Sequence, residues 1–403
     1  MTVLTDIGAL YTVPRDGGQD AVGVIRDAAV AMRDGRVAWV GRDADLPAEY
    51  ADAETRSAAG RAVIPGLVDC HTHLAFGGDR TGEFVARLRG ADYLAQAREG
   101  GGIASTVRAT RAATDDALRD QAAAMLRSML RRGVTTVEAK SGYGLSLEHE
   151  LRQLRAIRDA AAGTPQRVVA TCLAMHTVPP EHAGARADYV QHVVDDIYPA
   201  VAAEGLAAFA DAFVEDTAFS PDEGRRALLA ARALGLTPRL HADQITDSGG
   251  ARLAAEIGAS SADHLERVSA DGIAALAASD TVAVSLPLAS LVLGVEPLPA
   301  RALIDAGVPV AVATDYNPGS APVADLPLAM WTACTVQRMT PAEVLKGATA
   351  YAARALRLDA VGSLVPGFAA DWVEIDAPSV DAWMYSFRHD AVARVGVAGE
   401  PVA

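Results

Sequence analysis

Short apolar runs and longer amphipathic stretches alternate through the middle of the chain. The runs have the length of strands, and the first of them, Val63–Val68, is apolar without alternation, which is typical of a strand covered on both faces. Eight of them are predicted strands: Val63–His71, Val134–Lys140, Arg167–His176, Ala208–Glu215, Pro238–Asp243, Ala259–His264, Val282–Leu286 and Val308–Asp315. Ala-rich helical patterns separate most of these strands, for example Asp115–Arg132, Ser146–Ala162, Pro221–Leu234, Gly249–Ile257 and Leu298–Ala306. This alternation predicts an α/β fold, a parallel (β/α)8 TIM-like barrel.

Both ends of the chain have a different pattern, in which short strand-like segments are separated by Gly and Asp. These segments are Val3–Ile7, Ala28–Met32, Arg36–Gly41, Leu364–Ile375 and Val392–Val402. The Asp34-Gly35 pair is a hairpin signal between two of them. We therefore expect residues 1–62 and 357–403 to form a small discontinuous β-sandwich domain, and residues 63–356 to form the barrel.

The composition narrows the kind of partner. The net charge of −15 argues against binding to nucleic acid or to an anionic membrane surface, so a small-molecule substrate is expected. The sequence has no run of about 18 apolar residues and no signal-peptide pattern. Its three cysteines, Cys70, Cys172 and Cys334, are too scattered for a disulfide framework, and we expect reduced thiols in a cytoplasmic protein.

Histidines and an aspartate stand at the ends of the predicted strands. The carboxyl ends of the strands carry the active site in barrels of this kind. His71 and His73 end the first strand, and alternate residues of a strand point to the same face. His241 ends the fifth strand and Asp315 ends the eighth. Any one of these residues has an ordinary structural interpretation, but all four together favour a metal site.

Three imidazoles and a carboxylate form a mixed nitrogen and oxygen ligand set. Such a set suits Zn²⁺, with Fe or Mn as alternatives. We predict one ion held by His71, His73, His241 and Asp315. An ion of this kind lowers the pKa of a bound water toward about 7, so that hydroxide forms near neutral pH.

Lys140 and His264 also end predicted strands but fall outside this ligand set. In related barrels a carbamylated lysine that bridges two metals comes from a later strand, so Lys140 is expected to pair with a carboxylate such as Glu138. His264 is expected to hydrogen-bond the attacking water or the oxyanion, and a structural histidine held by Asp263 is the alternative. The remaining histidines are expected to be structural or at the surface: His149, His182, His192 and His389.

Six stretches of the barrel together resemble the amidohydrolase superfamily and, within it, the imidazolonepropionase family of histidine degradation. They are PGLVDCHTHLAFGGDR (65–80), EAKSGYGL (138–145), AMHTVPPE (174–181), HADQI (241–245), GGARLAAEIGASSADHLE (249–266) and ATDYNPGS (313–320). These stretches follow the family's order through the whole barrel, which makes the combination far more specific than a lone HxH motif.

The resemblance implies roles for residues that spacing alone does not single out. It implies that the imidazolone or its propionate is held by Arg80, Tyr143, His176 and Gln244, and that the formimino-glutamate portion is held by Asn317, Gly319 and Ser320. Arg80 offers a planar guanidinium for a carboxylate. Some relatives have Glu where this chain has Gln244. Because an amide cannot act as a general base, we expect Asp315 or His264 to be the catalytic proton carrier.

The activity implied is hydrolysis of 4-imidazolone-5-propanoate to N-formimidoyl-L-glutamate. One divalent or trivalent ion per subunit, Zn or Fe, is the implied cofactor, and the family is compatible with a homodimer. Two alternatives stay open. The first is a deaminase or another cyclic amidase of the same superfamily, which ammonia release would reveal. The second is an inactive homologue used as a scaffold, which intact ligands at all four positions argue against.

Overall fold

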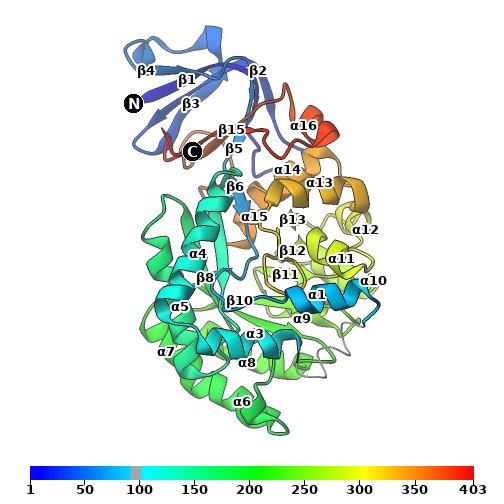
Figure 1. Ribbon diagram of the computed structural model, residues 1–403. Helices are drawn as coiled ribbons and strands as arrows, with labels where there is room; N and C mark the ends of the chain where they lie inside the picture. The colour runs from blue at the N-terminus through cyan, green and yellow to red at the C-terminus, as the bar shows by residue number, and fades with distance from the viewer. Residues whose placement is uncertain (92–100) are drawn as a thin grey trace.

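The barrel organises the molecule, and the computed structural model describes it within residues 1–91 and 101–403. In this described part, eight strands pair in parallel in the order β13-β12-β11-β10-β9-β8-β7-β6, so that chain neighbours are also spatial neighbours. The predicted α/β barrel is therefore confirmed (Figure 1). Its strands are β6 (Leu67–Asp69), β7 (Val134–Lys140), β8 (Arg167–Met175), β9 (Phe209–Val214), β10 (Thr237–Ala242), β11 (Ser261–His264), β12 (Val282–Ser285) and β13 (Val310–Val312).

The last strand meets the first just beyond their carboxyl ends. Thr72 and Tyr316 form a parallel bridge there. The backbone N–H of His73 donates to the carbonyl of Tyr316 (2.7 Å), and the N–H of Asp315 donates to the carbonyl of His71 (3.1 Å). This closure sets the predicted ligands of the first strand directly beside the predicted ligand of the eighth.

Helices surround the barrel (Figure 1). The five helices predicted as examples are observed with ends within two residues of those expected, and α8 begins with a capping box between Ser220 and Glu223 around Pro221. The described helices of this part are α1 (Thr81–Leu88), α3 (Gly102–Ala112), α4 (Asp115–Leu130), α5 (Leu147–Ala161), α6 (Arg186–His192), α7 (Tyr198–Ala203), α8 (Pro221–Ala233), α9 (Gly250–Glu256), α10 (Ala270–Ala277), α11 (Pro287–Leu293), α12 (Ala300–Asp305), α13 (Leu326–Gln337), α14 (Pro341–Gly347) and α15 (Ala350–Ala355).

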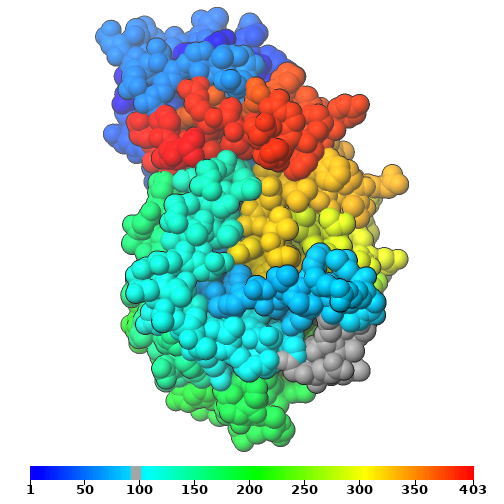
Figure 2. Space-filling model, viewed as in Figure 1, coloured from blue at the N-terminus to red at the C-terminus, as the bar shows by residue number. Residues whose placement is uncertain are grey.

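A second, mixed sheet is built from both ends of the chain, as predicted. Its path is β16-β15-β14-β5-β1-β2-β3, with β4 also paired to β1. In Figure 2 the blue N-terminal and red C-terminal residues lie against each other in the upper lobe. The elements are β1 (Thr2–Tyr11), β2 (Val24–Arg33), β3 (Arg36–Arg42), β4 (Glu54–Ser57), β5 (Ala62–Pro65), β14 (Trp372–Ile375), α16 (Val380–Ser386), β15 (Val392–Val397) and β16 (Glu400–Pro401).

The predicted first barrel strand, Val63–His71, is two strands rather than one. The chain leaves the small sheet after β5 and enters the barrel at β6, with Gly66 between them. A Cβ on Gly66 would lie 2.2 Å from the Thr135 hydroxyl, so only glycine fits at this passage. A continuous apolar run does not reveal such a change of sheet, because both sheets bury it. The division at residues 62 and 357 stays a proposal.

None of the described helices is long and apolar enough to span a membrane.

Candidate active site

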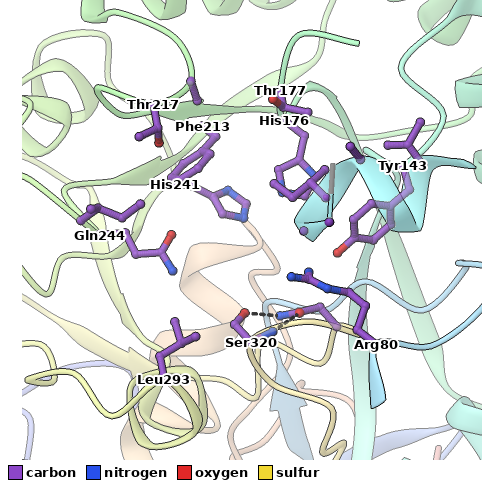
Figure 3. Close-up of a pocket in the computed structure, with 18 of the residues that line it drawn as sticks. Arg80, Tyr143, His176, Thr177, Phe213, Thr217, His241, Gln244, Leu293 and Ser320 are labelled. Atoms are coloured by element: carbon purple, nitrogen blue, oxygen red, sulfur yellow. Dashed lines mark hydrogen bonds between the residues drawn. The ribbon is translucent and has the colours of Figure 1, made fainter. Parts of the chain in front are cut away.

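A cavity of about 1110 Å³ lies at the carboxyl ends of the barrel strands. Figure 3 shows side chains from separate strands and loops converging on it, among them Arg80, Tyr143, His241 and Gln244. Most of the residues predicted for the site line this cavity: His73, Arg80, Tyr143, His176, His241, Gln244, His264, Asp315, Asn317 and Ser320. The other two, His71 and Gly319, do not line it: His71 is buried beside His73 and His241, and Gly319 lies against Arg80.

The four predicted ligands are buried together. Asp315 Oδ1 lies 3.4 Å from His71 Nε2 and 3.6 Å from His73 Nε2. The His241 ring centroid lies 4.6 Å from that of His71. Two groups of three residues have ligand atoms within 4.8 Å of one another, one with His71, His73 and Asp315 and the other with His71, His241 and His264. His264, which the sequence analysis left outside the ligand set, therefore lies close to two of its members, His71 and His241.

The chemistry of these atoms fits a metal ion. The Nε2 atoms of His71 and His241 are buried without a hydrogen-bond partner, an arrangement that normally costs free energy unless something binds there. Burial holds the pKa of His71 and of His73 well below the usual histidine value, and neighbouring positive groups lower both further. Neutral imidazole is the form that coordinates a metal.

Backbone strain accompanies these strand ends. Asp243, His264 and Asp315 have φ of +50°, +80° and +55°, although none of them is glycine. Such conformations cost about 1–3 kcal/mol each and gather at functional sites. They turn the chain sharply where each strand meets its loop. Sequence patterns gave no sign of this strain.

His264 and Asp315 influence each other's protonation. Burial lowers the pKa of His264, but Glu266 and Asp315 outweigh burial and raise it above the usual histidine value. Burial also raises the pKa of Asp315, against the opposing charges of His264 and His241. Glu266 lines the cavity and was not predicted; its Oε1 lies 3.5 Å from His264 Nδ1.

Arg80 is buried against Glu83. Its Nε and Nη2 atoms lie 2.8 and 2.7 Å from Glu83 Oε2. Gly319 packs directly against the Arg80 guanidinium. A Cβ at Gly319 would lie only 1.9 Å from Arg80 Nη1. Arg87 also reaches this point and donates to the carbonyl of Gly319 (3.2 Å). Glu83 therefore orients the Arg80 guanidinium, and the lack of a side chain at Gly319 leaves the space that the guanidinium fills.

Two residues of α5 hold the loop that carries Tyr143. Glu150 accepts the backbone N–H groups of Gly144 and Leu145 at 2.9 and 2.7 Å. Gln153 accepts the N–H of Tyr143 (3.0 Å) and donates to the carbonyl of Ala75 (2.6 Å), which joins this loop to the chain beyond His73. Neither residue was predicted, because their partners are set by the packing of α5.

The remaining predicted residues lie in loops with their own supports. His176 Nδ1 lies 2.9 Å from the carbonyl of Gly142. Asn317 closes a tight turn: its Oδ1 accepts the N–H groups of Gly319 and Ser320, each at 2.8 Å, and its amide donates to the carbonyl of Asp315 (2.7 Å). The Asn317 side chain thus shapes the loop that follows Asp315. Gln244 faces the cavity from the loop after β10 (Figure 3).

Lys140 forms ion pairs inside the barrel. Its ammonium donates to Glu138 (2.8 Å), as predicted, and to Asp211 (2.9 Å). The four histidines expected to be structural are outside the lining of the cavity and are partly or fully exposed: His149, His182, His192 and His389.

Comparison with known proteins agrees with this geometry. The sequence model of the amidohydrolase family matches residues 62–402. Proteins named imidazolonepropionase are similar over most of their length. The protein of Ralstonia nicotianae is 51% identical over 89% of this chain and 89% of its own. That of Geobacillus kaustophilus is 47% identical over 91% of this chain and 88% of its own.

Solved structures share the fold at low sequence identity. Escherichia coli guanine deaminase superposes with a TM-score of 0.76 at 18% identity, over 100% of this chain and 99% of its own. The zinc complex of atrazine chlorohydrolase from Arthrobacter aurescens superposes with a TM-score of 0.71 at 17% identity, over 100% of this chain and 95% of its own. With the family model spanning the barrel and half of the residues shared with several relatives, the chain belongs to the amidohydrolase family and, within it, to the imidazolonepropionases.

Proposed function

We propose that the protein hydrolyses 4-imidazolone-5-propanoate to N-formimidoyl-L-glutamate, in a metal-dependent reaction of histidine degradation. The observation that carries this proposal is one cavity lined by His73, His241, Asp315 and the Arg80 side chain, with His71 buried directly beside the first three. The chain's identity of about one half to named imidazolonepropionases supports the substrate. The homodimer and the cytoplasmic location expected from the sequence stay predictions.

The cluster of His71, His73, His241 and Asp315 would hold the ion. Zn or Fe suits three imidazoles and one carboxylate. When bound at such a site, a metal polarises a carbonyl oxygen and lowers the pKa of a coordinated water to about 7. His264 lies close enough to the cluster to donate a hydrogen bond to the oxygen that becomes negative in the transition state.

The substrate's two ends fit two parts of the cavity. Arg80, fixed by Glu83, would bind the propionate with a charge-assisted hydrogen bond, and the Tyr143 hydroxyl points toward the same region (Figure 3). His176 and Gln244 would contact the imidazolone ring from the opposite side. The turn of Asn317, Gly319 and Ser320 would face the portion that becomes formimino-glutamate.

Hydrolysis needs one proton moved from water to the departing ring nitrogen. The attacking oxygen forms a bond to the ring carbonyl carbon, the bond from that carbon to nitrogen breaks, and the nitrogen takes the proton. Asp315 belongs to the cluster and also lines the cavity, so it would accept the proton from water and pass it to the nitrogen. Gln244 cannot serve as the base, because its amide does not accept a proton at neutral pH.

Product analysis tests this proposal. Purified protein would receive the substrate made in place from urocanate by urocanase, and mass spectrometry would follow N-formimidoyl-L-glutamate. A parallel sample would be stripped with a chelator and then reloaded with Zn²⁺ or Fe²⁺. We expect product to form well above the spontaneous breakdown of the substrate, to disappear on stripping and to return on reloading.

The same samples separate the alternatives. Ammonia release without N-formimidoyl-L-glutamate would indicate a deaminase instead. No turnover by protein that does bind metal would contradict the proposed substrate while leaving the metal site intact. Protein that binds no metal would favour the inactive scaffold.

A further inference from the structure

A layer of charged side chains lies inside the barrel beneath the proposed ligands. Four strands of the barrel supply the side chains named here, each of which has no exposed surface: Glu138 and Lys140 on β7, Asp211 on β9, Arg239 on β10 and Asp263 on β11. Barrel interiors of this fold are normally filled with branched apolar residues. The charged layer is therefore a departure that needs a physical reason.

The charges are paired with one another. Lys140 Nζ lies 2.8 Å from Glu138 Oε1, 2.9 Å from Asp211 Oδ2 and 3.8 Å from Asp263 Oδ2. Arg239 Nη2 donates to Asp263 Oδ2 (2.9 Å) and to the carbonyl of Cys70 (2.8 Å). Asp263 is thereby held by Arg239 of the adjacent strand β10, and Asp211 by Lys140 of β7, two strands away.

The same two aspartates face the proposed ligands. Asp263 Oδ2 lies 2.6 Å from His71 Nδ1, and Asp211 Oδ2 lies 3.1 Å from His241 Nδ1. A proton on Nδ1, shared with the carboxylate, leaves Nε2 as the lone-pair nitrogen. The Nε2 atoms of both rings are buried without a hydrogen-bond partner, and that of His71 faces Asp315. The two Nδ1 atoms differ: that of His71 is hydrogen-bonded to Asp263, whereas that of His241 lies at ion-pair distance from Asp211 without an aligned hydrogen bond.

Stability does not account for the layer. Taking several charges out of water costs free energy that their mutual attraction only partly offsets, and well-packed apolar residues of similar size commonly do as well or better. A carboxylate behind a ligating histidine, however, fixes the tautomer and the ring orientation and makes the imidazole a stronger ligand.

We propose that Asp263 and Asp211 are positioning residues for the metal site, which orient His71 and His241 respectively, and that Lys140 and Arg239 hold these two carboxylates in place. Lys140 is thus part of the support of the site rather than a metal ligand. The inference rests on the metal site of the proposed function but not on the identity of the substrate.

The test compares Asp263→Asn and Asp211→Asn with Glu374→Gln. Glu374 on β14 is also a fully buried carboxylate paired with arginine (Arg394 Nε, 2.9 Å), but it lies in the small sheet. Zn²⁺ affinity would be measured by competition with a chromophoric chelator, the visible spectrum after Co²⁺ loading would report ligand geometry, and thermal unfolding of the metal-free proteins would report stability.

We expect the two Asp→Asn variants to bind Zn²⁺ about 10–100-fold more weakly and to show a changed Co²⁺ spectrum. Glu374→Gln should lose stability without either effect. Wild-type affinity and an unchanged Co²⁺ spectrum in both Asp→Asn variants would overturn the proposal, even if their metal-free forms unfolded earlier. Wild-type protein that binds neither metal would instead refute the metal site itself.

A measurement on the wild-type protein covers the case in which the variants do not fold. In Zn²⁺-loaded protein with ¹⁵N-labelled histidine, magnetic resonance distinguishes a protonated Nδ1 from a protonated Nε2. We expect His71 and His241 to carry the proton on Nδ1. A proton on Nε2 of either ring would contradict the assigned support for that ring.

Discussion

Gly319 has no side chain, and the Arg80 guanidinium lies where a Cβ would be. The two residues belong to opposite ends of the barrel sequence and meet only because the barrel closes. At the scale of single residues, this site is shaped as much by contacts behind the functional groups as by the groups themselves. Glu83 fixes Arg80, and Asp263 lies behind His71.

Gly319→Ala should weaken substrate binding with little effect on stability. The new methyl group would displace the far end of the Arg80 side chain, which can move without unfolding the loop. Loss of a charge-assisted hydrogen bond, about 1.5–3 kcal/mol, predicts a rise in KM of roughly 10–150-fold with a smaller change in kcat. Steady-state kinetics would measure both constants. Gly82→Ala is the matched control, because a Cβ there meets nothing within 4 Å. An unchanged KM would contradict the role of Arg80.

Asp315→Asn should abolish turnover even when the variant is saturated with metal. The amide keeps the shape of the side chain but cannot accept the proton from water, and a general base is worth about 10²–10⁴-fold in rate. The measurement is kcat at saturating Zn²⁺, together with metal content by elemental mass spectrometry. Asp271→Asn, at an exposed position in the first turn of α10, is the control. Near wild-type kcat in Asp315→Asn would assign the proton to His264 instead.

At the scale of elements, side chains from neighbouring elements hold the loops that carry the site residues. Glu150 and Gln153 of α5 hold the Tyr143 loop. Glu215, which follows β9, accepts the N–H of Ile245 (2.8 Å) and so supports the loop that carries Gln244. Each loop is thus tied to the neighbouring element by a buried carboxylate or amide. The positions of Tyr143 and Gln244 therefore depend on residues that never touch the substrate.

Glu150→Gln should loosen the Tyr143 loop. At present, backbone N–H groups of the loop donate to the Glu150 carboxylate. In the variant, the amide nitrogen of Gln would face some of these N–H groups and could not accept from them. Each buried donor left unpaired costs about 1–3 kcal/mol. We expect a lower free energy of unfolding in urea and a higher KM. Glu148→Gln, exposed on the first turn of the same helix, should change neither quantity. A loss of stability with an unchanged KM would show that the contacts of α5 with this loop do not affect substrate binding.

At the scale of the whole molecule, hydrogen bonds join the N-terminal loop between β1 and β2 to barrel elements late in the sequence. Lys346 on α14 donates to the carbonyls of Asp16 (2.9 Å) and Gly18 (3.0 Å), in the loop between β1 and β2. Gln19 of that loop donates to the carbonyl of Val310 (2.7 Å). The small sheet, which also takes strands from the C-terminus, is thereby joined to the barrel by more than the covalent chain.

Lys346→Met should destabilise the protein without altering the site. Its ammonium is buried among carbonyl oxygens, so removing it leaves buried acceptors unpaired, at a cost of roughly 3 kcal/mol in the free energy of unfolding. Urea unfolding would measure the loss. Arg354→Met removes a mostly exposed pair with Asp280 and should cost less than about 1 kcal/mol. A kcat changed by Lys346→Met would show that the docking of this loop reaches the active site.

Much of the fold and part of the candidate site could be predicted from the sequence, because these features depend on residues close together in the chain. Strand and helix patterns depend on neighbouring residues, so the alternation of the barrel and helices such as Asp115–Leu130 were predictable. His71, His73, His241 and Asp315 were predictable because each lies at the carboxyl end of a strand or in the few residues after it. Glu150 and Glu266 were not, since their partners are set by packing.

The sequence by itself determined which side chains end each strand, because the alternation of strands and helices is written in local hydrophobicity. The tertiary structure alone decided which of those ends meet. Thr314 and Asp69 are 245 residues apart, yet the Thr314 hydroxyl donates to Asp69 (2.7 Å) where the barrel closes. That closure brings both Asp315 and the buried Asp263 to His71. Such contacts arise from packing between distant elements, which no local pattern encodes.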